Sequence, residues 1–357
     1  MKIIRLIFWL IITLFSGKIS AQDPVLITLE PHKFYFHPET DNELSFKKYQ
    51  GFLSTADLDY IIYDLLGNKL MEGSAQTSDN VNMSTSVNLA AGYYRIYFPN
   101  NNTYFGLSVL PYRDREPDLF YGVHSNLCRD DELTDLSTSE KKIRHENVVK
   151  TLKKTGIGIV RDRVRPAIIN PSPGVFNWQG NNHRYEDARK LLEKYNIQIM
   201  PFFAFSPPWM KRPEERVGGN PDEHKYPTNL HAMTTAWDSI YRRWSKVMTK
   251  IEVWNEPRGG TQERLAPLVH SMAYTFDKLG HNTEMVGCAF TSRTLDKYSS
   301  DMAQMKCFEA LDVYSFHQYT KPEIAGNMLM TIRKTLDNCD QEYMPVMNSE
   351  SGAQYIG

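Results

Sequence analysis

Cysteine is scarce in this sequence. In 357 residues there are four, far apart, with no Cys-x-x-Cys pair and no histidine at metal-ligand spacing from them. This pattern argues against a zinc site. In an oxidising compartment four cysteines could pair in three ways. A bond between Cys307 and Cys339 is favoured, because both precede strands that we expect to be neighbours, and buried free thiols are the alternative. The four cysteines are Cys128, Cys288, Cys307 and Cys339.

The sequence also lacks an excess of either charge. Lysine and arginine together number 41, and aspartate and glutamate together number 42. A nucleic-acid or membrane-surface partner would require a basic patch, so this balance argues against both kinds of partner. Aromatic residues make up 12% of the chain, which is compatible with sugar stacking and equally with a large core.

No apolar run is long enough to span a bilayer, which takes about 20 residues. The run at residues 6–15 follows Lys2 and Arg5 and gives way to small and polar residues that end at Ala21. This is the layout of a secretory signal peptide, which we place at residues 1–21. No cysteine follows the run, so a lipid anchor is not expected there. We expect a soluble mature protein that is secreted or periplasmic.

Residues 22–113 carry the pattern of an all-β domain. Two hairpins are predicted, one at residues 59–71 around Gly67-Asn68 and one at residues 92–110. In the second hairpin three alternate residues share one face: Tyr94, Ile96 and Phe98. This spacing predicts a β-sandwich of roughly 90 residues, similar to the immunoglobulin-like modules of secreted bacterial enzymes. We interpret it as a packing or spacer domain, with carbohydrate binding as the alternative.

In residues 114–357, short apolar strands alternate with helical patterns. One predicted helix starts at a capping box, Ser137 to Glu140, and is ended by Gly156. The seven predicted strands are residues 119–123, 156–160, 197–203, 251–254, 284–288, 311–316 and 344–347. This alternation predicts a parallel α/β fold, and a β/α (TIM) barrel is the simplest architecture with so many repeats. A closed barrel has eight strands, so we expect a barrel truncated before its eighth strand, because the sequence ends at Gly357.

A carboxylate directly follows the fourth predicted strand. Residues 251–254 run into Asn255-Glu256-Pro257, and Pro257, which has no backbone N–H, stops the strand. A second carboxylate, Glu350, follows the seventh strand. Ligands and chemistry sit at the carboxyl ends of the strands in α/β barrels. We therefore expect the two carboxylates to meet.

Five motifs stand in order along residues 118–357. They are residues 156–162 followed by 173–178, residues 205–210, residues 254–257, residues 315–319, and Glu350. The series resembles the retaining glycoside hydrolases of clan A, and it is most similar to family 39, the xylosidase and iduronidase-like family. Two features depart from the clan. The eighth-strand tryptophan has no counterpart here, and Arg165-Pro166-Ala167 stands where a tryptophan often follows the arginine.

The resemblance implies a glycosidase with two catalytic carboxylates and with neither a metal nor a cofactor. It implies that Glu350 is the nucleophile and Glu256 the acid/base. One carboxylate attacks the anomeric carbon while a carboxylic acid protonates the leaving oxygen, and in retaining enzymes the two groups lie about 5–5.5 Å apart. We expect their pKa values to be pushed apart, so that Glu256, near the negative charge of Glu350, keeps its proton near neutral pH.

Further residues are implied around the carboxylates. The resemblance places Arg161 beside the nucleophile Glu350, which the guanidinium would keep ionised. An ion pair between Arg161 and Asp162 is the alternative, and Arg163, on the same face of the strand, is the reserve candidate. Asn255 is placed to donate a hydrogen bond to the sugar 2-hydroxyl.

Substrate contacts are also expected from two other strands. Tyr319 is placed to hydrogen-bond Glu350, and His317 to orient that carboxylate or to contact a hydroxyl. The alternative for His317 is a core histidine with satisfied hydrogen bonds. His124 and Asn126, just past the first strand, are candidates for substrate binding, with loop capping as their alternative.

One aromatic residue is a candidate sugar platform. Trp209 lies at the head of a long predicted loop, residues 206–229. Loops of this length at a catalytic face are usually functional, so the indole could stack on a pyranose ring. Packing within the loop is the alternative.

Together these observations predict an exported retaining glycosidase with a carbohydrate substrate. It would cleave O-glycosidic bonds of a plant or algal polysaccharide, or its oligomers, by double displacement. One alternative is a carbohydrate-binding barrel that has lost catalysis, which the presence of both carboxylates disfavours. The other is a transglycosylase, which would use the same residues with a drier acceptor site.

Overall fold

A computed structural model describes most of the chain, in thirteen segments. They are residues 27–29, 35–36, 43–48, 58–77, 82–99, 102–109, 118–129, 136–180, 183–212, 225–257, 262–291, 295–319 and 322–352. The chain divides into two compact units, residues 1–114 and 115–357. The predicted signal peptide, residues 1–21, lies outside the described residues. Within the described part, no helix combines the length and the apolarity needed to cross a membrane.

The first unit is a β-domain. Its strands are β1 (Ile27–Leu29), β2 (Tyr35–Phe36), β3 (Glu43–Lys48), β4 (Leu58–Asp64), β5 (Lys69–Thr77), β6 (Asn82–Ser86), β7 (Gly92–Phe98) and β8 (Thr103–Val109). They follow the order β1-β3-β6-β5-β4-β7-β8-β2, and all pairs are antiparallel except β2 with β8. β5 pairs with β4 up to Ala75 and with β6 from Gln76 onward. A strand that changes partners in this way makes a corner between two sets of strands.

Both predicted hairpins of the β-domain are present. Gly67, with φ of 86°, turns the chain between β4 and β5, a conformation that glycine adopts without steric cost. The Asp64 carboxylate accepts hydrogen bonds from the backbone and the side chain of Asn68, both at 2.8 Å. The predicted alternation along β7 is also confirmed, because its buried members are Tyr94, Ile96 and Phe98. These three side chains belong to the core of the domain.

The second unit is a parallel barrel. Its strands are β9 (Asp118–His124), β10 (Ile157–Val164), β11 (Gln198–Phe203), β12 (Lys250–Glu252), β13 (Glu284–Thr291), β14 (Val313–Gln318) and β15 (Val346–Ser351). Each strand pairs in parallel with the next one along the chain. All seven predicted strands are therefore confirmed, and they form a nearly closed barrel. Among the described residues, β9 and β15 end the sheet and do not pair with each other.

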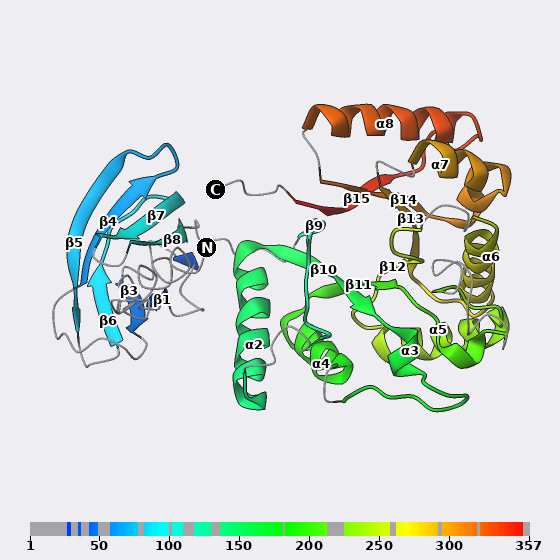
Figure 1. The fold of residues 1–357 in the computed structure, drawn as a ribbon, viewed down its shortest axis with the longest axis horizontal. Coiled ribbons are helices and arrows are strands. Elements are labelled where there is room, and N and C mark those ends of the chain that lie inside the picture. The colour runs from blue at the N-terminus through cyan, green and yellow to red at the C-terminus, as the bar shows by residue number, and fades with distance from the viewer. Residues whose placement is uncertain are drawn as a thin grey trace, which may run out of the picture. The chain divides into compact units, whose positions relative to one another are not determined.

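Helices surround the strands in chain order, as Figure 1 shows. They are α2 (Thr138–Thr155), α3 (Pro166–Ile169), α4 (Tyr185–Tyr195), α5 (Leu230–Trp244), α6 (Gln262–Lys278), α7 (Leu295–Gln304) and α8 (Pro322–Asp337), with 3-10 helices η3 (Pro208–Met210) and η6 (Cys307–Ala310). The predicted capping box is present at α2. Ser137 Oγ accepts from the backbone N–H of Glu140, whose carboxylate accepts from the backbone N–H of Ser137. Gly156, at φ of 77°, ends the helix.

The cysteines do not pair. All four are free, so the favoured Cys307–Cys339 disulfide was wrong. The Sγ of Cys307 lies 3.8 Å from the carbonyl oxygen of Met305, and the Sγ of Cys339 lies 3.3 Å from the carbonyl oxygen of Thr335, one turn back in the chain. Each thiol contacts a carbonyl oxygen of its own segment. The pairing of the two following strands was therefore not sufficient to bring the sulfur atoms together.

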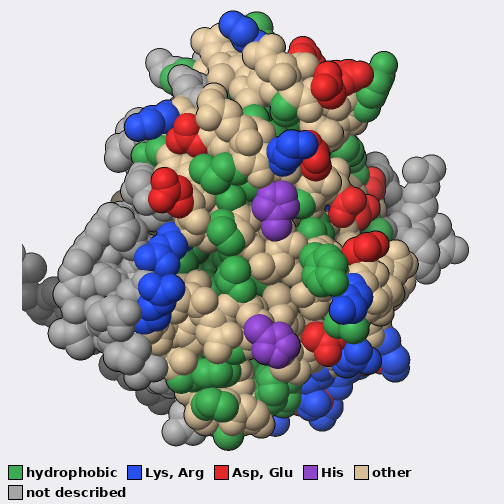
Figure 2. All heavy atoms as spheres, turned by 90° about the vertical axis from the view of Figure 1, so that its right-hand side faces the viewer, with side chains coloured by type: hydrophobic (Ala, Val, Ile, Leu, Met, Phe, Trp, Pro, Cys, Tyr) green, Lys and Arg blue, Asp and Glu red, His purple; other side chains and the backbone are tan. Residues whose placement is uncertain are grey.

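The outside of the barrel unit carries charges of both signs. Figure 2 views the side on which α5, α6 and α7 lie and shows acidic and basic side chains scattered among uncharged ones. Some of these charges join neighbouring helices. Glu186 of α4 pairs with Arg189 of its own helix and with Arg243 of α5, each at 2.9 Å. The hydrogen bond from Arg189 outweighs partial burial and lowers the pKa of Glu186 to about 2.

Two neighbouring positions on α8 test how much the core contributes. Ile332 is fully buried in the barrel core, whereas Met330 is 66% exposed. We expect Ile332→Ala to lower the free energy of unfolding by about 2–4 kcal/mol, because it leaves a cavity. Met330→Ala should change it by less than about 0.5 kcal/mol. Urea denaturation of both variants measures this, and equal losses would contradict the assigned face of α8.

Candidate active site

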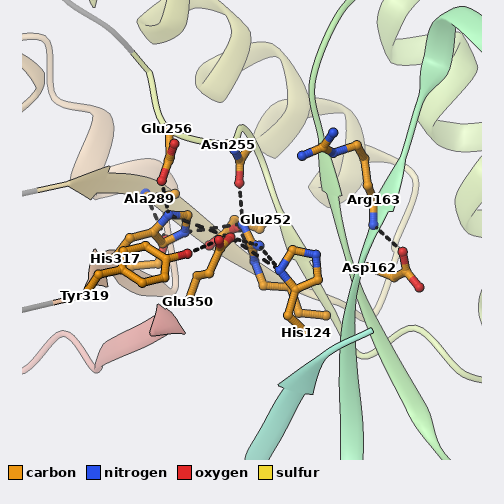
Figure 3. Close-up of polar contacts among 12 residues, drawn as sticks. His124, Asp162, Arg163, Glu252, Asn255, Glu256, Ala289, His317, Tyr319 and Glu350 are labelled. Carbon is orange, nitrogen blue, oxygen red and sulfur yellow. Dashed lines mark hydrogen bonds and ion pairs between the residues drawn. The ribbon is translucent and has the colours of Figure 1, made fainter. Parts of the chain in front are cut away.

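Polar side chains converge at the carboxyl ends of the barrel strands (Figure 3). They come from five strands and the residues just after them. β9 supplies His124, β10 supplies Arg161, and β15 supplies Glu350. β12 and the turn after it supply Glu252, Asn255 and Glu256, while His317 lies in β14 and Tyr319 just beyond its end. Because parallel strands end at one edge, residues far apart in the sequence meet there. The predicted convergence of Glu256 and Glu350 is present in the structure.

The two predicted catalytic carboxylates lie close together. Oxygen atoms of Glu256 and Glu350 and a ring nitrogen of His317 all lie within 4.8 Å of one another. Glu256 has φ of 45°, as part of the turn between β12 and Pro257. A non-glycine residue rarely adopts this conformation, and such strain, about 1–3 kcal/mol, concentrates at functional sites where the surroundings hold it. Phe205, just past β11, has a similar φ of 64°.

Arg161 connects the catalytic face. Its side chain is only 3% exposed. The Nε atom donates to Glu252 Oε2 at 2.8 Å, and the two terminal nitrogens donate to Glu350 Oε2 at 2.5 Å and to Asn255 Oδ1 at 2.7 Å. The guanidinium also lies 3.8 Å above the ring of Phe202. One cation therefore bridges two carboxylates and orients an amide.

Arg161 does not pair with Asp162, so that alternative was wrong. Asp162 lies on the opposite face of β10, where its carboxylate accepts from Ser125 Oγ at 2.8 Å and from the backbone N–H of Cys128 at 3.1 Å. The carboxyl is fully buried, and burial raises its pKa to about 6 despite these hydrogen bonds. Asp162 thus fixes the segment after β9 rather than the site.

Sequence reasoning missed Glu252. This residue is fully buried in β12 and shares Arg161 with Glu350. Its Oε1 atom is buried without a hydrogen-bond partner among the described residues. One feature of the sequence could have identified it: Glu252 stands inside an apolar strand, and a buried carboxylate requires a cation nearby. The cation that pairs with it, Arg161, stands 91 residues earlier in the chain and had been assigned to the nucleophile alone.

Glu350 is held as a carboxylate. Burial acts to raise its pKa, but hydrogen bonds from His124 and Tyr319 and the charge of Arg161 together bring the pKa well below the usual glutamate range. Tyr319 donates directly to Glu350 Oε1, and His124 Nδ1 lies 3.5 Å from Oε2. Both Glu350 oxygens therefore have donors.

Glu256 departs from the expectation that it keeps its proton near neutral pH. The hydrogen bond with His317, at 3.0 Å between Nδ1 and Oε1, outweighs burial and lowers the pKa of Glu256. His317 Nε2 lies 3.3 Å from a terminal nitrogen of Arg161. Because a guanidinium only donates, Nε2 accepts and Nδ1 carries the proton toward Glu256. The expectation did not include this donor.

Two predicted contacts lie away from the carboxylates. Asn126 is exposed and accepts a hydrogen bond from Arg129, three residues along its own loop. The indole N–H of Trp209 donates to the carbonyl oxygen of Asn170 at 2.9 Å, and the ring packs against the barrel core. Trp209 therefore follows the loop-packing alternative. A different tryptophan, Trp254, takes a place beside the site.

Two cavities open at the carboxylates. A cleft of about 350 Å³ lies along β9 and β15, and its lining includes His124, Arg161 and Glu350. A smaller cavity of about 170 Å³ is lined by Asn255, Glu256, Arg163 of β10 and residues that follow β11. Glu350 thus lines the larger cleft and Glu256 the smaller cavity.

The fold has solved relatives. A family 39 glycoside hydrolase from the gut symbiont Bacteroides cellulosilyticus WH2 matches with a TM-score of 0.60 at 16% sequence identity, over 83% of this chain and 58% of that one. The chain has a family 39-like glycoside hydrolase fold. It spans less than two thirds of the length of that relative. No family model matches the sequence, and neither does any curated protein.

Other matches are more distant. A GH39 enzyme from Xanthomonas axonopodis pv. citri has a TM-score of 0.48 at 14% identity, over 68% of this chain and 53% of that one. The catalytic domain of GH30 xylanase C from Talaromyces cellulolyticus has a TM-score of 0.41 at 15% identity, over 57% of this chain and 54% of that one.

Glu256, His317 and Glu350 are close enough to hold a metal ion geometrically. Their hydrogen bonds do not fit that role. Both oxygens of Glu350 already accept hydrogen bonds, and Arg161 donates to one of them. A metal cation at this position would lie next to a buried guanidinium, and the two positive charges would repel each other.

The partnership of Arg161 and Glu252 generates a stability prediction. We expect Glu252→Ala to lower the free energy of unfolding by about 3 kcal/mol, because it removes one carboxylate from a buried cation. Glu284→Ala is the control: that glutamate pairs with Lys250 in the same sheet but is 50% exposed, so its loss should be below about 1 kcal/mol. Urea denaturation compares them. A loss for Glu252→Ala as small as the control would contradict the role of the pair.

Proposed function

We propose that this protein is an exported retaining glycoside hydrolase with Glu350 as nucleophile and Glu256 as acid/base. The observation that carries the proposal is that one oxygen of Glu350, from β15, and one of Glu256, from the turn after β12, lie within 4.8 Å of each other. A retaining mechanism requires about 5–5.5 Å, whereas an inverting one requires about 6.5–9.5 Å to admit a water molecule. The family 39-like fold supports the same assignment.

Glu350 attacks the anomeric carbon and forms a covalent glycosyl-enzyme. Arg161, Tyr319 and His124 keep its carboxylate ionised and fix its direction. Glu256 gives its proton to the leaving oxygen in this step, and it then takes a proton from the water that releases the sugar. The same two residues serve both halves of the reaction, so configuration at the anomeric carbon is retained.

Glu256 requires a proton before the first step. His317 donates to Oε1, which leaves Oε2 to carry the proton toward the glycosidic oxygen. In the free protein this hydrogen bond lowers the pKa of Glu256. A bound sugar would displace water from the half-buried carboxyl and so raise its pKa. Substrate binding then favours the protonated form that the reaction consumes.

Asn255 is arranged to bind the sugar. Its Oδ1 accepts from Arg161 at 2.7 Å, which leaves the amide N–H groups to donate. The residue lines the same cavity as Glu256. A hydrogen bond to the sugar 2-hydroxyl strengthens at the oxocarbenium-like transition state.

Export of the enzyme rests on the signal-peptide pattern of residues 1–21.

Removal of the nucleophile tests the mechanism. We expect Glu350→Gln to reduce kcat on an activated aryl glycoside by at least about 10⁴-fold, because no covalent intermediate forms. Glu350→Gly with added azide should recover turnover and release a glycosyl azide, which mass spectrometry detects. Glu309→Gln, on the exposed surface, serves as the control and should keep full activity.

Three outcomes would redirect the proposal. Turnover that survives in both Glu350 variants would remove the assignment of the nucleophile. Calorimetric sugar binding by the full-length protein without any hydrolysis would favour a binding protein. Transfer of the sugar mainly to other saccharides, seen in product analysis, would favour a transglycosylase.

The depressed pKa of Glu350 predicts the acid side of the pH profile. Because the ionised form is active, kcat/KM should stay high until the pH falls below the ordinary glutamate pKa of about 4.3. Tyr319→Phe removes a donor that lowers this pKa, so its acid limb should move upward toward that value. Tyr343→Phe, on a residue 90% exposed, should leave the limb unchanged. Identical acid limbs in all three proteins would contradict the role of Tyr319.

A further inference from the structure

The smaller cavity has a composition that the proposed reaction does not explain. It measures about 170 Å³ and is lined by Arg163, Phe205, Lys225, Tyr226, Trp254 and the pair Asn255-Glu256. Two of these side chains are cations. Among the described lining residues, Glu256 is the one anion, and it is already hydrogen-bonded to His317.

Among the described residues, no carboxylate forms an ion pair with Arg163 at this cavity. Its Nε atom is buried and has no hydrogen-bond partner among the described residues. Figure 3 shows the side chain extending from β10 on the side of Asn255, with its guanidinium directed away from the Asp162 carboxylate. Arg161, two residues earlier on the same strand, has carboxylates at the corresponding place. The two arginines on one face of β10 thus differ: Arg161 has two carboxylate partners, and Arg163 has none within the part of the chain that the structure describes.

The surroundings of Arg163 are unfavourable for a lone cation. Burial lowers its pKa, and the charges of Arg129 and Arg165 lower it further, although Glu350 opposes them. The Phe202 ring lies 5.3 Å from the guanidinium. A partly buried cation is less well hydrated than one in water, and an anion that forms a bidentate pair with the guanidinium offsets that loss.

The other walls fit a sugar ring that carries an anion. The ammonium group of Lys225 lies 5.5 Å from the centre of the Phe205 ring. Tyr226 and Trp254 also line the cavity; they stack with ring centres 4.4 Å apart and are almost fully buried, whereas Phe205 is 44% exposed. Aromatic surface packs against the apolar face of a pyranose, while Arg163 and Lys225 supply positive charge.

We propose that this cavity binds an anionic sugar unit, carrying a carboxylate or a sulfate ester, beside the bond that is cleaved. Arg163 makes the bidentate contact, and Lys225 adds the second positive charge. The inference rests on the proposed glycosidase function and specifies its substrate class. A neutral sugar in the same place would cover the guanidinium without supplying a negative charge.

Binding measurements on an inactive protein test this. The full-length Glu350→Gln variant would be titrated calorimetrically with alginate oligosaccharides and their carboxyl-reduced counterparts, and with carrageenan oligosaccharides and their desulfated counterparts. We expect at least one anionic probe to bind about tenfold or more tighter than its neutral match. The pair that shows the difference identifies carboxylate or sulfate as the group recognised.

Variants of Arg163 link the preference to the cavity. Adding Arg163→Met should remove the difference between charged and neutral probes, while Arg163→Lys should retain part of it. Arg144→Met, an exposed arginine on α2, is the control and should keep the full preference. Circular dichroism checks that each variant is folded.

Two results would overturn the inference. One is equal binding of charged and neutral probes, and the other is an unchanged preference in Arg163→Met. Hydrolysis of aryl glycosides by the wild-type protein then decides separately about the proposed function. If hydrolysis is present, only the anionic cavity is wrong, and if it is absent along with all sugar binding, both proposals are wrong.

Discussion

The catalytic face depends on one buried cation. Arg161 is almost fully removed from water, and a charge in that position is stable only with counter-charges in direct contact. Glu252 and Glu350 supply them. Since the three residues come from β10, β12 and β15, the ion pairs connect strands on different sides of the barrel. The position of the proposed nucleophile is therefore tied to the packing of the whole sheet.

The arrangement of the strands was predictable because it follows from local pattern and from the geometry of parallel sheets. All seven barrel strands are apolar runs separated by helical periodicity, and all are present. The meeting of Glu256 and Glu350 follows from the same geometry, because both stand at the carboxyl ends of strands. Pro257 marks one of those ends in the sequence itself. These predictions required no knowledge of individual side-chain partners.

What could not be predicted is the choice of partners over long distances in the chain. Arg161 and Glu252 are 91 residues apart, and nothing local links them. The pKa of Glu256 depends on which ring nitrogen of His317 carries the proton. The position of Arg161 beside Nε2 places that proton on Nδ1. Trp209 was predicted at the head of a loop; it lies in η3, and a hydrogen bond to the carbonyl oxygen of Asn170 fixes its direction. In each case several hydrogen-bond partners compete for one side chain, and the spacing of residues in the sequence does not show which partner is chosen.

The shared cation also reconciles two opposing requirements of the proposed nucleophile. Glu350 must be ionised to attack, yet each donor that stabilises its charge also lowers its basicity and hence its reactivity. If Arg161 faced Glu350 alone, its full charge would stabilise the resting carboxylate. Glu252 takes two of the guanidinium's hydrogen bonds, so Glu350 keeps only one of them. Arg161 therefore keeps the proposed nucleophile ionised, while the buried Glu252 limits how strongly the guanidinium stabilises it.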